Sequence, residues 1–206
     1  MVRLTHLLMT NNTRQLLRSK VEVFSHEGGD FFELLVSLEG QTLGHYRVLN
    51  LFEVGGQGIL YSVQHPDYPN VPLLLKLPFI EHHRPAYLSE RIFRRRRYTI
   101  CHEAFILKRF QLPAFPQCKD FFWATNPLID SWWGSVVSKK DPCLIMEHLT
   151  GELLDDALAK LHQQKRFKQI YRIACQAATT FLNLSLQILK SEEHGFLYTD
   201  LRPGNL

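Results

Sequence analysis

The chain has 206 residues, of which 45% are hydrophobic and 21% are charged, and its formal net charge is +4. A chain of this length and composition folds with a substantial core, as one large domain or as one domain of two lobes. The weak positive balance suits an anionic ligand such as a phosphate and does not by itself indicate nucleic acid. None of the four cysteines forms a C-x-x-C pair, which argues against a zinc site or a disulfide framework.

No apolar run in the sequence has the length of a membrane span, and the N-terminal apolar run is too short for a signal peptide. We therefore expect a cytoplasmic protein, or one delivered to a host cytosol by a signal that leaves no hydropathy trace.

The first 45 residues are expected to form an N-terminal extension. Residues 10–20 are compatible with a short helix. The segments "KVEVF" and "FFELLVSL" are alternating or continuously apolar, which predicts strands on either side of a turn at residues 28–30.

From residue 46 the pattern becomes clearer. Three strands are predicted at "YRVLNLFEV", "ILYSVQH" and "LLLKLPF", with "GGQG" between the first two. Residues 81–97 look like a charged insertion, and residues 98–110 show the apolar spacing of a helix.

The remaining chain is predicted to be a hairpin followed by helices. "SWWGSVV" and "CLIMEHL" resemble paired strands, with Asp141 and Pro142 in the turn between them. An amphipathic helix follows at "ELLDDALAKLHQQ", and "FKQIYRIACQAATTFLNLSLQILK" is so apolar that a buried central helix is expected. Because strands and helices are segregated along the chain, the predicted fold class is α+β.

The first candidate site feature is the glycine loop in "EVGGQGILY". Gly55, Gly56 and Gly58 lack Cβ atoms, so the backbone can approach a ligand and its N–H groups can bond to phosphate oxygens. Taken alone, the same stretch also fits a hairpin turn with an additional glycine.

The second and third features are a lysine and a glutamate. Lys76 interrupts a run of leucines, where a cation needs an anionic partner unless it extends to the surface. Glu103 shares a helical stripe with Ile106 and Leu107 that should face the sheet, which makes it the candidate partner of Lys76. A solvated position for Glu103 is the alternative. Glu90 is a rival partner, but its neighbours suggest exposure to solvent.

The fourth feature is the terminal stretch "YTDLRPGNL". Asp200 can orient a hydroxyl group and accept its proton, Asn205 can bind Mg²⁺, and Arg202 between them can neutralise a phosphoryl group. Taken alone, these residues also fit a turn that caps the preceding helix.

Together, these features occur in an order that resembles the protein kinase family, of the eukaryotic-like serine/threonine type. The resemblance covers residues 46–206, with an N-lobe at 46–149 and a partial C-lobe at 150–206. "DLRPGN", close to the family's D-L-K-P-x-N, is its strongest element. It implies an antiparallel N-lobe sheet with one αC-type helix, and it implies ATP and Mg²⁺ as ligands.

The resemblance also implies roles for single residues around the nucleotide. The three glycines would cover the phosphates, and Leu60 would pack against adenine. Lys76 would hold the α- and β-phosphates and pair with Glu103. Met146 would be the gatekeeper, and Glu147 and Leu149 would offer hinge backbone groups to adenine.

In the terminal loop, the resemblance implies that Asp200 is the catalytic base, that Arg202 replaces the usual lysine and that Asn205 binds Mg²⁺. The chain also departs from the family pattern at Glu53, which replaces the first loop glycine, and at Tyr198-Thr199, which replaces His-Arg before the aspartate. The sequence given also stops before a D-F-G motif, so we expect a truncated domain with little kinase activity alone.

Two other functions stay open at the level of sequence. One is a kinase of the same fold acting on a sugar, an amino alcohol or a lipopolysaccharide, in place of a serine or threonine of a protein. The other is a non-catalytic pseudokinase that binds a partner. The run of Arg94, Arg95, Arg96 and Arg97 is interpreted as a solvated helix face or as a docking patch for an acidic partner.

Overall fold

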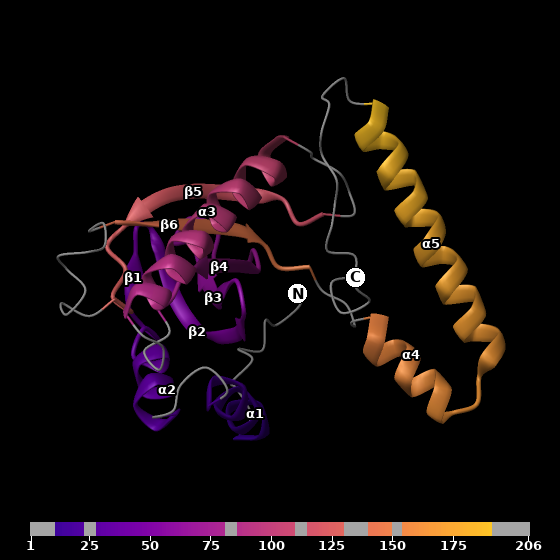
Figure 1. The fold of residues 1–206 in the computed structure, drawn as a ribbon, viewed down its shortest axis with the longest axis horizontal. Helices are drawn as coiled ribbons and strands as arrows, with labels where there is room; N and C mark the ends of the chain where they lie inside the picture. The colour runs from indigo at the N-terminus through magenta and orange to yellow at the C-terminus, as the bar shows by residue number, and fades with distance from the viewer. Residues whose placement is uncertain are drawn as a thin grey trace. The chain divides into compact units, whose positions relative to one another are not determined.

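Six antiparallel strands form one sheet in the N-terminal part of the chain (Figure 1). The structure is a computed structural model and describes residues 11–22, 28–80, 86–109, 115–129, 140–149 and 154–190. The chain forms two units, residues 1–149 and residues 150–206. The sheet order is β1-β2-β3-β4-β6-β5, and the strands are β1 (Thr42–Leu43), β2 (Tyr46–Gly55), β3 (Gly58–Gln64), β4 (Leu73–Leu77), β5 (Cys118–Ala124) and β6 (Asp141–Glu147).

The three strands predicted between residues 46 and 79 are confirmed as β2, β3 and β4. Side chains alternate between the two faces of a strand. In β4, Leu73, Leu75 and Leu77 therefore lie on one face, while Leu74 and Lys76 lie on the other. Both faces of the sheet are covered, which explains why every residue of β4 except Lys76 is a leucine.

Two helices cover the face of Leu75: α1 (Asn11–Glu22) and α2 (Gly28–Val36). The short helix expected at residues 10–20 is confirmed as α1. The strand expected at "FFELLVSL" is wrong, because this segment belongs largely to α2. Phe31, Leu35 and Leu38 are spaced by helical steps and all are buried in the core. A short, continuously apolar run does not distinguish a strand from a buried helix. The strand expected at "KVEVF" is also wrong for residues 20–22, which form the last turn of α1, and residues 23–27 lie outside the described residues.

The helices α1 and α2 share their core with the strands. Leu17 and Val21 from α1 belong to the same buried cluster as Val48 and Leu75 from the sheet. The boundary expected after residue 45 stays a prediction, but α1 and α2 contribute directly to the packing of the N-terminal unit.

One long helix, α3 (Ala86–Arg109), covers the opposite face of the sheet (Figure 1). Its residues Ile100, Ala104 and Leu107 pack against Leu144 and Met146. The helix predicted at residues 98–110 is therefore present but begins earlier, and the charged insertion expected at 81–97 is wrong for residues 86–97. Arginine is a good helix former, so a run of charge does not by itself interrupt a helix.

The strand before β6 differs from the predicted hairpin. Asp141 and Pro142 begin β6 and do not form a turn, and β6 pairs with β5, a strand that was not predicted. Proline is tolerated near the start of a strand because few ladder bonds are lost there. The expected partner "SWWGSVV" lies outside the described residues.

The second unit contains α4 (Leu154–Gln163) and α5 (Phe167–Lys190), both as predicted. The expectation that α5 is buried is wrong for its described side chains, since Tyr171, Leu182 and Leu186 are exposed. An apolar helix is buried only where other elements cover it, and α4 is the described helix that packs on α5. None of the helices in the described part of the chain is long and apolar enough to cross a lipid bilayer.

The Tyr61 hydroxyl connects the sheet to α2 and gives a test of this packing. It is fully buried and donates a hydrogen bond to the carbonyl of Leu35 at 3.0 Å. We expect Tyr61→Phe to lower the free energy of unfolding by about 1 kcal/mol, because the carbonyl loses a buried partner. Urea unfolding measures the effect. The exposed Tyr68 is the control, and an equal loss in Tyr68→Phe would contradict the assignment.

Candidate functional site

A half-buried ion pair joins the sheet to α3. Lys76 Nζ lies 2.6 Å from Glu103 Oε2, and the two side chains are 14% and 29% exposed. Lys76 pairs in register with Leu60 and Leu144, so it points to the face that α3 covers. The structure thus brings together the two charges that the sequence predicts as partners. Charge-assisted hydrogen bonds of this length are strong, and losing one partner would leave the other charge poorly solvated.

The glycine-rich turn, residues 55–58, lies next to Lys76. Gly55 and Gly58 pair across the end of β2 and β3. A Cβ atom on Gly58 would lie 2.9 Å from the carbonyl oxygen of Leu77 and 3.4 Å from the Lys76 side chain. The absence of a side chain at Gly58 therefore allows the turn to lie against β4 beside the lysine. Gly56 is open, because a Cβ atom added there would have no neighbouring atom within 4 Å.

An apolar surface continues from this turn on the same face of the sheet. Leu60 is opposite Lys76, and Leu74 is opposite Met146. Leu74 was not singled out in the sequence, although it precedes Lys76 by two positions on the same strand and therefore shares its face. The cation, the glycine-rich turn and three apolar side chains consequently occupy one face.

The chain leaves the sheet after Glu147, the last residue of β6. The N–H of Glu147 donates to the carbonyl of Gln117 at 2.9 Å, and the N–H of His148 donates to the carbonyl of Pro72 at 3.1 Å. Leu149, the last described residue of this unit, is exposed. These bonds fix the path of the segment for which the family resemblance implies a hinge role. That role stays a prediction for Glu147 and Leu149.

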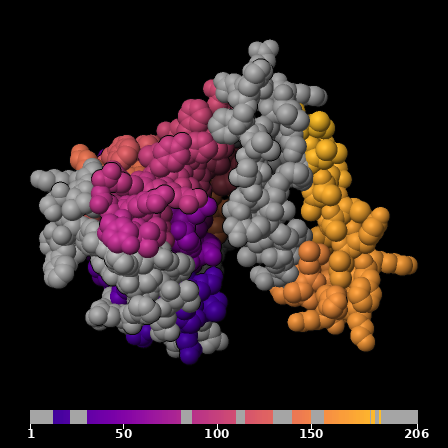
Figure 2. Space-filling view, viewed as in Figure 1, coloured from indigo at the N-terminus to yellow at the C-terminus, as the bar shows by residue number. Residues whose placement is uncertain are grey.

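The arginine run is divided between solvent and interior. Helix α3 lies at the surface of its unit (Figure 2), where Arg94 and Arg95 are exposed and Arg94 pairs with Glu90. Arg96 is only 4% exposed; its Nε donates to the carbonyl of Gly56 at 2.8 Å and its Nη1 to that of Phe79 at 3.0 Å. The expectation of one solvated run or one docking patch is therefore wrong for the second half of the run.

Arg97 forms a second ion pair under α3. Its Nε lies 3.0 Å from Asp141 Oδ1, and its Nη2 donates to the carbonyl of Lys140 at 3.0 Å. The Asp141 side chain is 1% exposed, and neither of its oxygens has a well-aligned hydrogen bond. Burial raises the pKa of Asp141 to about 6, although Asn126 and Arg97 lower it again in part. Desolvation thus outweighs the ion pair at this position.

The predicted catalytic loop belongs to the part of the chain that the structure does not describe. Asp200, Arg202 and Asn205 lie outside the described residues, so their roles stay predictions. Across the ranges that the structure describes, no three His, Cys, Asp or Glu side chains gather as metal ligands.

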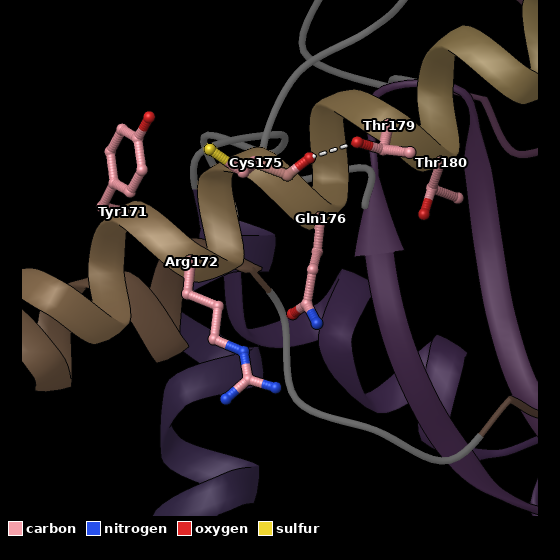
Figure 3. A pocket seen from close by; sticks show the side chains of 6 residues that line it. All are labelled: Tyr171, Arg172, Cys175, Gln176, Thr179 and Thr180. Atoms are coloured by element: carbon pink, nitrogen blue, oxygen red, sulfur yellow. Dashed lines mark hydrogen bonds between the residues drawn. The ribbon is translucent and has the colours of Figure 1, made fainter.

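A pocket of about 620 Å³ lies along α5 and was not predicted. Figure 3 shows its lining side chains on successive turns of this helix, where the Thr179 hydroxyl donates to the carbonyl of Cys175 at 2.8 Å. The pocket offers one cation, Arg172, and no carboxylate among its described lining residues. These are Tyr171, Arg172, Cys175, Gln176, Thr179 and Thr180.

Two glycines of the turn make a matched pair of substitutions. We expect Gly58→Ala to lower the free energy of unfolding by about 1–3 kcal/mol, because its methyl group would overlap the carbonyl of Leu77. Gly56→Ala meets open space, so its effect should stay within about 0.5 kcal/mol. Denaturant unfolding compares the two variants. Equal losses would show that the turn does not lie against β4 as described.

The buried Asp141 predicts a dependence of stability on pH. Its pKa in the folded state, about 6, is above its ordinary value of 3.8, so the ionised form costs stability at pH 7. This cost falls as the pH decreases through 6 towards 4. As the pH falls from 7 to 5, we expect Asp141 to raise the free energy of unfolding by about 1 kcal/mol.

Comparison with Asp141→Asn isolates this contribution. Free energies of unfolding are measured in urea at both pH values. Lowering the pH from 7 to 5 should stabilise the wild type by about 1 kcal/mol more than the variant. A change of the same size in both proteins would contradict a raised pKa for Asp141.

Comparisons with known proteins find solved structures that are similar to part of this chain. No family model matches the chain, and no curated protein matches it. The chain is similar to the PknI kinase domain of Mycobacterium tuberculosis, with 21% identity over 59% of this chain and a TM-score of 0.37. It is also similar to PpkA-294 in its apo form, with 15% identity over 61% of this chain and a TM-score of 0.42.

The chain spans 39% of the PknI kinase domain and 43% of PpkA-294. The α+β class is confirmed by the observed elements: α1 and α2 lie on one face of the sheet and α3 on the other, and α4 and α5 follow along the chain.

Proposed function

We propose that the chain is the nucleotide-binding part of an ATP-dependent, protein-kinase-like phosphotransferase that acts on serine or threonine hydroxyls. The observation that carries the proposal is the 2.6 Å contact between Lys76 and Glu103, beside the glycine-rich turn. Glu103 holds the ammonium group in place, so that one cation is available at a fixed point on this face of the sheet.

The surroundings of this cation fit a nucleoside triphosphate. The turn has no side chain at Gly58, which leaves its backbone close to Lys76. Backbone N–H groups in glycine-rich turns bind phosphate oxygens, and an ammonium group adds a full charge to them. Leu60 lies across from Lys76 and supplies an apolar contact for a base. We assign the phosphates to the turn and to Lys76, and adenine to the side of Leu60.

The chemistry of transfer is assigned to the terminal loop on sequence grounds. Asp200 accepts the proton of the attacking hydroxyl, and Arg202 offsets charge on the phosphoryl group. Asn205 supplies an oxygen ligand to Mg²⁺, which would neutralise phosphate charge when bound. The Leu-Arg-Pro sequence between the aspartate and the asparagine favours protein substrates over small molecules.

Titration of the purified chain with ATP and Mg²⁺ tests the nucleotide site. We expect Lys76→Met to weaken ATP binding by about 10–100-fold, because one charged hydrogen-bonding partner of the phosphates is lost. Lys76→Met also leaves Glu103 unpaired, so the double variant Lys76→Met/Glu103→Gln is the control. It removes both charges and should fold, yet it should bind ATP as weakly as the single variant.

Isothermal titration calorimetry separates the outcomes. Absence of ATP binding by the wild-type chain at millimolar concentration would favour a non-catalytic binding module instead. Binding that is unchanged in Lys76→Met would show that the nucleotide lies elsewhere on the protein.

A further inference from the structure

Arg96 is a buried cation on α3 whose guanidinium group donates a hydrogen bond to the glycine-rich turn. Besides its bonds to the carbonyls of Gly56 and Phe79, its guanidinium carbon lies 3.7 Å from the centre of the Phe79 ring. Burying a guanidinium group is costly unless strong acceptors and a polarisable surface compensate for lost water. These contacts therefore hold the side chain in a defined position between α3 and the turn.

Arg96 and Glu103 are seven positions apart on α3. Seven residues are close to two helical turns, so both side chains project from the same side of the helix. Glu103 contacts Lys76 on β4, and Arg96 contacts Gly56 between β2 and β3. One helix therefore holds both the cation and the turn, and a shift of α3 that broke one contact would strain the other.

The hydrogen bond to the Gly56 carbonyl also determines the direction in which the next backbone N–H group, that of Gln57, points. In a planar trans peptide, the carbonyl oxygen and the following N–H point in opposite directions. Because the Gly56 carbonyl points to Arg96, the N–H of Gln57 is held pointing away from Arg96. Glycine-rich segments otherwise sample many conformations, and each must be restricted before their N–H groups can bind a phosphate.

We propose that Arg96 is a positioning residue for phosphate binding: it fixes the glycine-rich turn to α3 and thereby couples the turn to the Lys76–Glu103 pair. This inference rests on the proposed function, since the phosphates in question are those of the nucleotide. It assigns to Arg96 no contact with the nucleotide itself.

Three variants of the full chain test this role. Arg96→Met retains a long apolar side chain over Phe79 but removes the donors, and Arg96→Lys retains the cation. Arg95→Met is the matched control, because Arg95 is the neighbouring arginine on α3 and its side chain is exposed. Two measurements are made on each protein: amide hydrogen exchange in residues 53–60, and the affinities for ATP and for adenosine.

In Arg96→Met, we expect amide exchange in the turn to rise about tenfold and ATP affinity to fall about tenfold, as for the loss of a charged hydrogen bond. Adenosine affinity should stay within about twofold, because adenosine has no phosphates for the turn to hold. Arg96→Lys should recover part of both losses, and Arg95→Met should resemble the wild type. If Arg96→Met does not fold, the same differences are expected in smaller form in Arg96→Lys.

Three results would overturn the inference. Equal losses of ATP and adenosine affinity would show a general structural role. Exchange in the turn that is the same in Arg96→Met and Arg95→Met would show that the turn is not held by Arg96. The third result is that the wild type binds no ATP while amide exchange in the turn still rises in Arg96→Met. Both the proposed function and the role of Arg96 in phosphate binding would then be wrong, whereas the hydrogen bond from Arg96 to the turn would be supported.

Discussion

The cost of burying charge between α3 and the sheet determines how the N-terminal unit is arranged. Lys76 projects from a strand of leucines, and its ammonium group has lost most of its water. Glu103 compensates for that loss only while α3 stays in register with β4. An apolar contact tolerates small displacements, whereas a 2.6 Å contact between two half-buried charges does not. The pair therefore makes the position of the helix a condition of stability.

Two further charges on α3 restrict it in the same way. Arg97 meets Asp141 at the start of β6, and Arg96 meets the turn between β2 and β3. The apolar residues Ile100 and Ala104 supply burial between these polar contacts. Burial is roughly proportional to area and has little direction, while hydrogen bonds and ion pairs depend on distance and angle. Burial accounts for the attachment of α3, and the charges account for its register.

The parts of the fold that could be predicted from the sequence are those where residues close together in the chain form a recognisable pattern. Strands β2 to β4 follow from alternation and turn residues, and the Lys76–Glu103 pair follows from the cost of a lone charge among leucines. Helix α2 was mistaken for a strand because its run is too short and too apolar to show a period. Strand β5 was missed because "CKDFFWA" does not alternate clearly. Arg96 could not be assigned, because its acceptors are backbone carbonyls that any residue could provide.

The glycine-rich turn has two requirements that oppose each other. It must lack a side chain at Gly58 to lie against Leu77, yet a glycine-rich backbone loses more conformational freedom on ordering than other segments, by about 0.5–1 kcal/mol per glycine. A residue with a side chain would make the turn easier to order, but at Gly58 it would clash with Leu77. A hydrogen-bond donor from a neighbouring element orders the backbone of the turn without adding atoms to it, so the turn can be both ordered and free of a side chain at Gly58. Arg96 reaches the turn from α3, the helix that also positions Glu103, so the turn is ordered when the ion pair is in place.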